Sequence, residues 1–275
     1  MRTTEETLQV QAAGAAHKVD RLREPVRFAV SGMFGGAYVG VAVVLMLNVA
    51  GPLSAAGTGL DKLVSGLVFG VALTLVVFAG AELVTSSMMT LTQGTLMRAT
   101  RTGPAVGALS FTFIANLLGA ALFGVLVAVS GVLHSNPPAG AMLEDMLAAK
   151  AVESPVELFV RGILCNSLVC LGIWMCARLT TDGPKLVVIF WALLAFVASG
   201  FEHVVANMTT YTLGLMTGDP HATWALFGNN LLWVGLGNLV GGAVVVGLAY
   251  WFVGGSPSVE LVDEVTAADA DREGQ

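Results

Sequence analysis

The chain has 275 residues, of which 55% are hydrophobic and only 12% are charged, and its formal net charge is −6. Soluble domains carry about 25% charged residues, so this composition excludes an ordinary soluble protein and favours an all-α membrane protein. Neither a nucleotide-binding fingerprint nor a cluster of metal ligands occurs in the sequence. We therefore expect no cofactor, no bound metal and no nucleic-acid partner.

In chain order, residues 1–27 are polar and lack the apolar core of a signal peptide, which predicts a cytoplasmic N-terminal segment lying as a helix at the membrane surface. A six-span domain is predicted over 28–253. Its apolar segments are 28–49, 62–97, 105–130, 157–177, 185–215 and 224–253. Residues 254–275 are polar and acidic and predict a disordered cytoplasmic tail.

The second and fifth apolar segments are too long for one straight crossing, which needs about 20 residues. Each contains a glycine and a glutamate, in AGAELVT at 79–85 and in SGFEHV at 199–204. A carboxylate at membrane depth is costly, and glycine allows a helix to break. Each segment is therefore predicted to be two half-helices joined by an irregular stretch that contains Glu82 or Glu202, as is typical of a transport site.

The first three spans resemble the last three. ANLLGA at 115–120 follows the first break much as GNLVGG at 237–242 follows the second. A three-span unit inserts its second copy upside down, so we predict two inverted three-helix repeats with facing breaks near the midplane.

The distribution of Lys and Arg predicts the orientation. One side of the membrane would hold Arg2, Lys18, Arg21, Arg23, Arg27, Arg98, Arg101, Arg178, Lys185 and Arg272, and the other would hold Lys62, Lys150 and Arg161. The positive-inside rule then predicts cytoplasmic N and C termini, in a multi-pass protein of the cytoplasmic (inner) membrane.

His203 is the strongest candidate for chemistry within the membrane, because His17, His134 and His221 fall in polar or loop segments. An imidazole donates a hydrogen bond whether it is charged or neutral. The alternative is a structural histidine bonded to neighbouring backbone. One buried histidine without a nearby nucleophile or second base argues against an enzyme.

Four other polar residues in the spans are predicted to support the breaks. Glu82 and Glu202 are expected to accept backbone N–H bonds from the unwound segments, and the alternative for both is a proton-carrying or ion-binding role. Asn116 and Asn238 are expected to make interhelical hydrogen bonds.

Three further residues have two interpretations each. Thr85 offers a hydroxyl where a half-helix begins, either to an anion or as a simple N-cap. Asn166 lies in the fourth span, where it reaches a buried histidine or glutamate or bonds another helix. Arg161 near the outer end of that span attracts anions or only extends to the interface.

Four stretches together resemble the formate/nitrite transporter family: AELVTSSMM (81–89), RGILCNSLVCLGIWM (161–175), FVASGFEHVVANM (196–208) and NNLLWVGLGN (229–238). The resemblance covers about 28–253 and is stronger to the nitrite-channel branch. It implies an aquaporin-like fold and a homopentamer with one pore through each protomer.

The resemblance also implies roles for individual residues. His203 would be the central pore histidine and Thr85 its partner on the loop that breaks span two, with Asn166 and Glu202 in the supporting polar network. Two apolar constrictions, one on each side of the histidine, would be formed by Phe69, Leu73, Leu83 and Phe196.

A dry apolar constriction strongly penalises an anion but not a neutral weak acid. We therefore predict that a basic vestibule attracts nitrite, for nitrate assimilation, and that a proton supplied at or near His203 lets it pass as nitrous acid. Passive anion conduction, with His203 only as a hydrogen-bond donor, is the alternative mechanism. A formate or hydrosulfide channel of the same family is the alternative function. A neutral-solute channel is less favoured because the sequence has no Asn-Pro-Ala motif.

Overall fold

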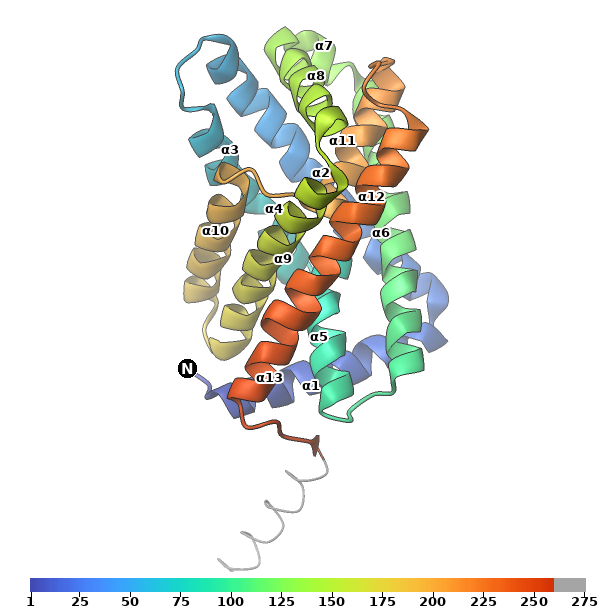
Figure 1. The fold of residues 1–275 in the computed structure, drawn as a ribbon, viewed down its shortest axis with the longest axis vertical. Coiled ribbons are helices and arrows are strands. Elements are labelled where there is room, and N and C mark those ends of the chain that lie inside the picture. Colours follow the sequence, from blue (N-terminus) through green and yellow to red (C-terminus); the bar gives the residue numbers. More distant parts are fainter. Residues whose placement is uncertain (260–275) are drawn as a thin grey trace, which may run out of the picture.

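The computed structural model describes residues 1–259, which fold as a bundle of helices (Figure 1). The helices are α1 (Thr4–Asp20), α2 (Pro25–Ala55), α3 (Asp61–Phe69), α4 (Val71–Phe78), α5 (Val84–Leu96), α6 (Thr102–Ser130), α7 (Val132–Ser135), α8 (Pro137–Val152), α9 (Pro155–Arg178), α10 (Asp182–Ala198), α11 (Val204–Thr217), α12 (Trp224–Leu239) and α13 (Ala249–Val253), with a 3-10 turn at Arg21–Arg23 and a π-helix at Val240–Leu248.

Five helical stretches among these residues are long and apolar enough to cross a membrane, with mean hydropathy between 1.8 and 2.2. They are Pro25–Ala55, Asp61–Phe78, Thr102–Ser130, Pro155–Arg178 and Trp224–Val253. The fifth apolar segment of the sequence is divided between α10 and α11, and neither part reaches this length alone. The chain is therefore a multi-pass, all-α membrane protein.

Both long apolar segments leave the helical conformation at the glutamate motif. The first is non-helical between Phe78 and Val84, and the second between Ala198 and Val204. Gly80 and Gly200 have φ angles of 79° and 73°, a left-handed conformation that side-chain-bearing residues adopt at a cost. The glycine therefore allows the chain to turn out of one half-helix before the next begins.

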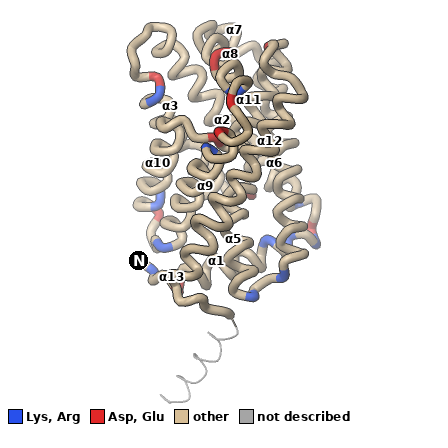
Figure 2. Tube along the Cα trace, in the orientation of Figure 1, with Lys and Arg blue, Asp and Glu red and all other residues tan. Residues whose placement is uncertain are grey.

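The half-helices that follow the breaks run toward opposite ends of the bundle (Figure 1). α5 packs against α1 at the end where α13 also lies, and α11 packs against α8 at the other end. Lys and Arg residues gather at the α1 end (Figure 2). This is the end that the positive-inside rule predicts to be cytoplasmic.

The terminal segments make defined contacts at the α1 end. α1 buries Leu8, Ala12 and Ala15 against the bundle, so most of the predicted N-terminal segment covers this end as a packed helix. After α13, the Val259 N–H donates to the Met97 carbonyl at 2.9 Å, and residues 254–259 are fixed there. Residues 260–275, where the rest of the predicted tail falls, lie outside the described part of the chain.

Candidate functional site

Asn116 on α6 and Asn238 on α12 hold the two breaks by the same set of hydrogen bonds. The Asn116 Nδ2 donates to the carbonyls of Gly32 at 2.7 Å and Glu82 at 2.8 Å, while its Oδ1 accepts from the Val84 N–H at 2.8 Å. The Asn238 Nδ2 donates to Gly162 at 2.8 Å and Glu202 at 2.9 Å, and its Oδ1 accepts from the Val204 N–H at 2.9 Å.

A carboxamide suits this position because it both donates and accepts. Val84 and Val204 are the first residues of α5 and α11, and the first N–H groups of a helix have no partner inside it. Glycines bring the neighbouring span close enough for these bonds, since a Cβ on Gly36 would overlap the Asn116 carbonyl and one on Gly162 would lie 2.8 Å from the Val234 carbonyl. The matching sets support the repeat predicted from the sequence.

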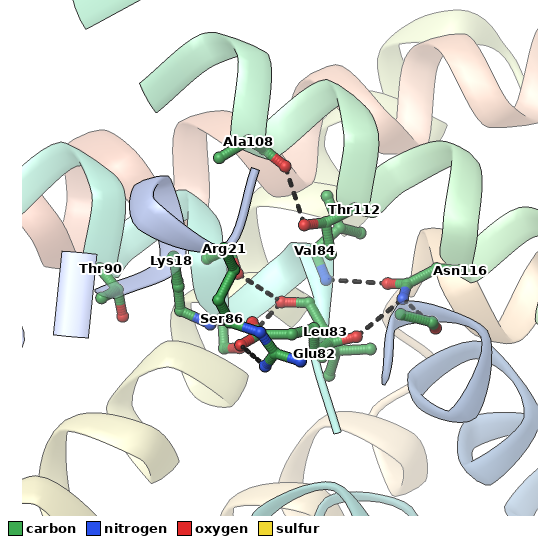
Figure 3. A network of polar contacts seen from close by, with 12 residues as sticks. Lys18, Arg21, Glu82, Leu83, Val84, Ser86, Thr90, Ala108, Thr112 and Asn116 are labelled. Atoms are coloured by element: carbon green, nitrogen blue, oxygen red, sulfur yellow. Dashed lines mark hydrogen bonds and ion pairs between the residues drawn. The ribbon is translucent and has the colours of Figure 1, made fainter. Parts of the chain in front are cut away.

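Within residues 1–259, neither glutamate side chain accepts a backbone N–H bond of the kind that we expected from the sequence. Glu82 instead pairs with Lys18 of α1 and, at 3.1 Å, with Arg21 (Figure 3). Glu202 accepts from Lys150 Nζ of α8 at 2.5 and 2.6 Å and from Asn207 Nδ2 at 2.6 Å. The asparagines already bond the first N–H of α5 and of α11, and a buried carboxylate needs a cation. The glutamates therefore bind α1 and α8 to the breaks through ion pairs.

These lysine partners were not predicted from the sequence because both lie outside the apolar segments. A signal was present, however. Each repeat is preceded by a short helix, α1 or α8, which carries a lysine 14 residues before Gly32 (32 − 18) or 12 residues before Gly162 (162 − 150). The repeating unit therefore includes a peripheral helix as well as three spans.

His203 and Thr85 come from different breaks and meet inside the bundle. The Thr85 Oγ1 lies 3.2 Å from His203 Nε2, and both side chains are buried. On the other side of the ring, the Ala206 N–H donates to His203 Nδ1 at 3.2 Å. Because Nδ1 accepts a hydrogen bond, the neutral ring carries its proton on Nε2 and donates it to Thr85. The Thr85 hydroxyl thus fixes the ring at Nε2, as the Ala206 N–H does at Nδ1.

The four residues expected to form the constrictions line one small chamber with His203. Phe69, Leu73, Leu83 and Phe196 surround a space of about 10 Å³, which is about the minimum that holds one water molecule. The Phe69 ring meets Phe196 edge-on at 5.8 Å between centroids, and Phe196 stacks on the imidazole at 5.9 Å. The structure therefore places the histidine against an apolar and nearly closed passage.

A larger cavity of about 330 Å³, which we call the vestibule, lies on the α8 side of this chamber and reaches His203. Its charged lining residues are Asp61, Lys62, Lys150, Glu153, Arg161 and Glu202. We expected a basic vestibule, but three cations face three carboxylates, and Lys150 and Arg161 are each paired with one, Glu202 and Glu153 respectively. The formal charge of the lining is balanced when all three carboxylates are ionised.

Asn166 supports the breaks through their backbone and makes no described hydrogen bond with His203 or the Glu202 side chain. Its Nδ2 donates to the Thr85 carbonyl at 3.1 Å and to the Asn238 carbonyl at 2.7 Å. This side chain therefore connects the first break to the asparagine that holds the second. Of the interpretations open from the sequence, the structure matches bonding to other helices.

Metal-binding side chains do not cluster in the described residues, where no group of three His, Cys, Asp or Glu is placed to hold an ion. Cys165, Cys170 and Cys176 are free and buried. The polar side chains of the site thus hold the backbone at the breaks, line the passage, or form ion pairs near it.

Comparison with known proteins agrees with this geometry. Residues 5–252 match the family described as formate/nitrite transporter. The nitrite transporter NirC of Escherichia coli (strain K12) is 40% identical over 250 residues, which cover 90% of this chain and 91% of that protein. A solved FNT family ion channel superposes with a TM-score of 0.84 at 38% identity, over 90% of this chain and 98% of its own.

A second solved structure, a pentameric formate channel with formate bound, superposes with a TM-score of 0.73 at 26% identity, over 84% of this chain and 98% of that one. These relatives are named as transporters or channels and not as enzymes. The chain belongs to the formate/nitrite transporter family.

Proposed function

We propose that this protein passes nitrite across the cytoplasmic membrane through a pore in each protomer of a homopentamer, with both termini in the cytoplasm. Nitrite enters from the vestibule, takes up a proton at or near His203 and crosses the apolar chamber as nitrous acid. The observation that carries the proposal is the chamber itself, where a hydrogen-bonding imidazole stands beside eight apolar side chains and about 10 Å³ of space.

The cost of charge explains why a proton is needed. An unpaired anion in an apolar medium is penalised by many kcal/mol, and the chamber is lined by Phe69, Leu73, Leu83 and Phe196 without a cation. A neutral acid loses only hydrogen bonds with water, and the imidazole of His203, which lines the chamber, replaces part of these.

The preference for nitrite over formate rests on similarity. The relative with 40% identity is a nitrite transporter, whereas the pentameric formate channel is 26% identical. Formate transport is the alternative, since formate is also a small planar monovalent oxoanion that forms a neutral acid. Competition between the two anions in the same uptake assay measures the preference directly.

His203→Asn separates a proton-handling histidine from one that only donates hydrogen bonds. An asparagine is able to accept from the Ala206 N–H and to donate toward Thr85, but it does not titrate. Purified protein in liposomes is assayed for uptake of nitrite and of formate at two pH values, with His203→Ala as the variant that loses both functions. Lowering the pH raises the fraction of substrate present as the free acid, and uptake changes with that fraction in any variant. We expect the native protein to show a further pH dependence of uptake, and we expect His203→Asn to lose it. If its rate and pH profile match the native protein, the proton-handling role is wrong.

A further inference from the structure

The vestibule contains a carboxyl group that the other break lacks. Glu153 lies between α8 and α9, lines the vestibule and pairs with Arg161. Its side chain is 10% exposed, and its Oε2 has no hydrogen-bond partner among the described residues. Arg161 is 40% exposed at its side chain, so the arginine of this pair is the member that a solute in the vestibule reaches.

The two breaks differ by one negative charge. At the first break, two cations, Lys18 and Arg21, pair with the single carboxylate of Glu82. At the second break, two cations, Lys150 and Arg161, face two carboxylates, Glu202 and Glu153. One proton on Glu153 would therefore give the second break the same excess of positive charge as the first.

Charged and titratable groups surround Glu153 on several elements. They are Lys150 on α8, Glu157 and Arg161 on α9, Glu202 and His203 in the second break, Tyr211 on α11, and Asp61 and Lys62 across the vestibule on α3. Burial raises the pKa of the Glu153 carboxyl above its ordinary value, and repulsion by Glu202 adds to this, while Lys150 and Arg161 oppose it. Because the pKa is raised, Glu153 takes up its proton at a higher pH than an exposed glutamate does.

We propose that Glu153 is a proton-binding site that controls anion entry, and that its protonation releases Arg161 to bind a small monovalent oxoanion in the vestibule. The inference rests on the proposed transport of nitrite. A guanidinium matches a planar oxoanion with two parallel N–H donors, as it matches a carboxylate. Nitrite replaces the Glu153 carboxylate as the partner of Arg161 and stands in the cavity that leads to His203.

The proposal predicts pH-dependent affinity more than a pH-dependent maximal rate. At low pH the vestibule carries one positive charge in excess and concentrates the anion. As pH rises through the pKa of Glu153, the carboxylate returns to Arg161 and competes with nitrite. Focusing of charge in a cleft changes local ion concentration by on the order of tenfold or more, so the half-saturating concentration should change by about that factor.

Glu153→Gln tests this site, because glutamine has the same shape and cannot ionise. Native protein and variant are reconstituted in liposomes with equal pH on both sides, and nitrite exchange is measured between about pH 5 and about pH 8. At the highest pH, we expect the half-saturating nitrite concentration of the native protein to be about ten times that of the variant. At the lowest pH, we expect the two concentrations to be nearly equal. A ratio that stays constant across this range overturns the proposal.

Glu144→Gln is the matched control, since it removes the same charge from an exposed position on α8 that does not line the vestibule. It should leave the native pH profile unchanged. A Glu153→Gln/Arg161→Gln double variant lacks the anion-binding guanidinium, and we expect weak affinity at every pH. If it binds nitrite as tightly as Glu153→Gln does, Arg161 is not the site. Absence of nitrite exchange by the native protein would instead refute the proposed function.

Discussion

Replacing Asn238 by alanine should destabilise the fold by roughly 3 kcal/mol, because three hydrogen bonds are lost at about 1 kcal/mol each. The variant leaves the Val204 N–H and the Glu202 carbonyl without this partner inside the bundle. The loss of stability includes the cost of leaving these two groups buried without a hydrogen-bond partner. At the protein surface, water would take the place of the missing partner. Asn116→Ala removes the matching set of bonds and should cost the same within about 1 kcal/mol.

The free energy of unfolding is measured by reversible denaturant titration in mixed micelles, followed by tryptophan fluorescence. Asn229→Ala is the control, since Asn229 lies on the same helix and makes no described side-chain hydrogen bond. Nitrite exchange is measured in parallel, and we expect it to fall in Asn238→Ala because this asparagine fixes the residues on both sides of His203. A loss below about 1 kcal/mol, equal to that of the control, would refute the assignment of the bracing to these carboxamides.

Two further substitutions test the ion pair and the constriction. Lys150→Met should destabilise the protein by about 3–5 kcal/mol because it leaves the buried Glu202 carboxylate without its cation, and adding Glu202→Gln should recover much of that loss in the same titration. Leu73→Ala should enlarge the chamber of about 10 Å³ enough to admit water, so osmotic water flow in stopped-flow light scattering should rise, and unchanged flow would show that Leu73 does not close the passage.

The positions of the two breaks were predictable from the sequence because charged or polar residues stand there within apolar segments. Glu82 and Glu202 are charged within apolar runs and Gly80 and Gly200 adjoin them, and the helices end within these stretches. Asn116 and Asn238 are polar in apolar spans, and both bond the unwound segments. Such residues can be recognised in a sequence because a polar group inside an apolar span needs a hydrogen-bond or ion-pair partner. Their occurrence at two matching positions indicates a repeat.

The partners of the glutamates were not predictable in the same way. Lys18 and Lys150 lie in ordinary polar segments, where a lysine needs no explanation, and they contact glutamates 64 and 52 residues away. Only the packing of α1 and α8 against the half-helices brings them there. The charge balance of the vestibule was not predicted for the same reason. In the sequence Glu153 belongs to the loop before the fourth span, and only the folded structure shows that it lies beside Arg161.

The proposed function depends on a difference between two equivalent positions. Leu83 and His203 each follow the glutamate of their break and each precede a valine whose N–H is held by an asparagine. Both line the same chamber. Two leucines here would leave a dry passage without a hydrogen-bond donor, whereas two imidazoles would bring polar groups and water to both walls. One residue of each kind keeps most of the chamber apolar, which in the proposed mechanism excludes an anion, and places one polar imidazole beside the passage of a neutral acid. The repeat positions the two breaks, and the proposed selectivity is assigned to the difference between Leu83 and His203.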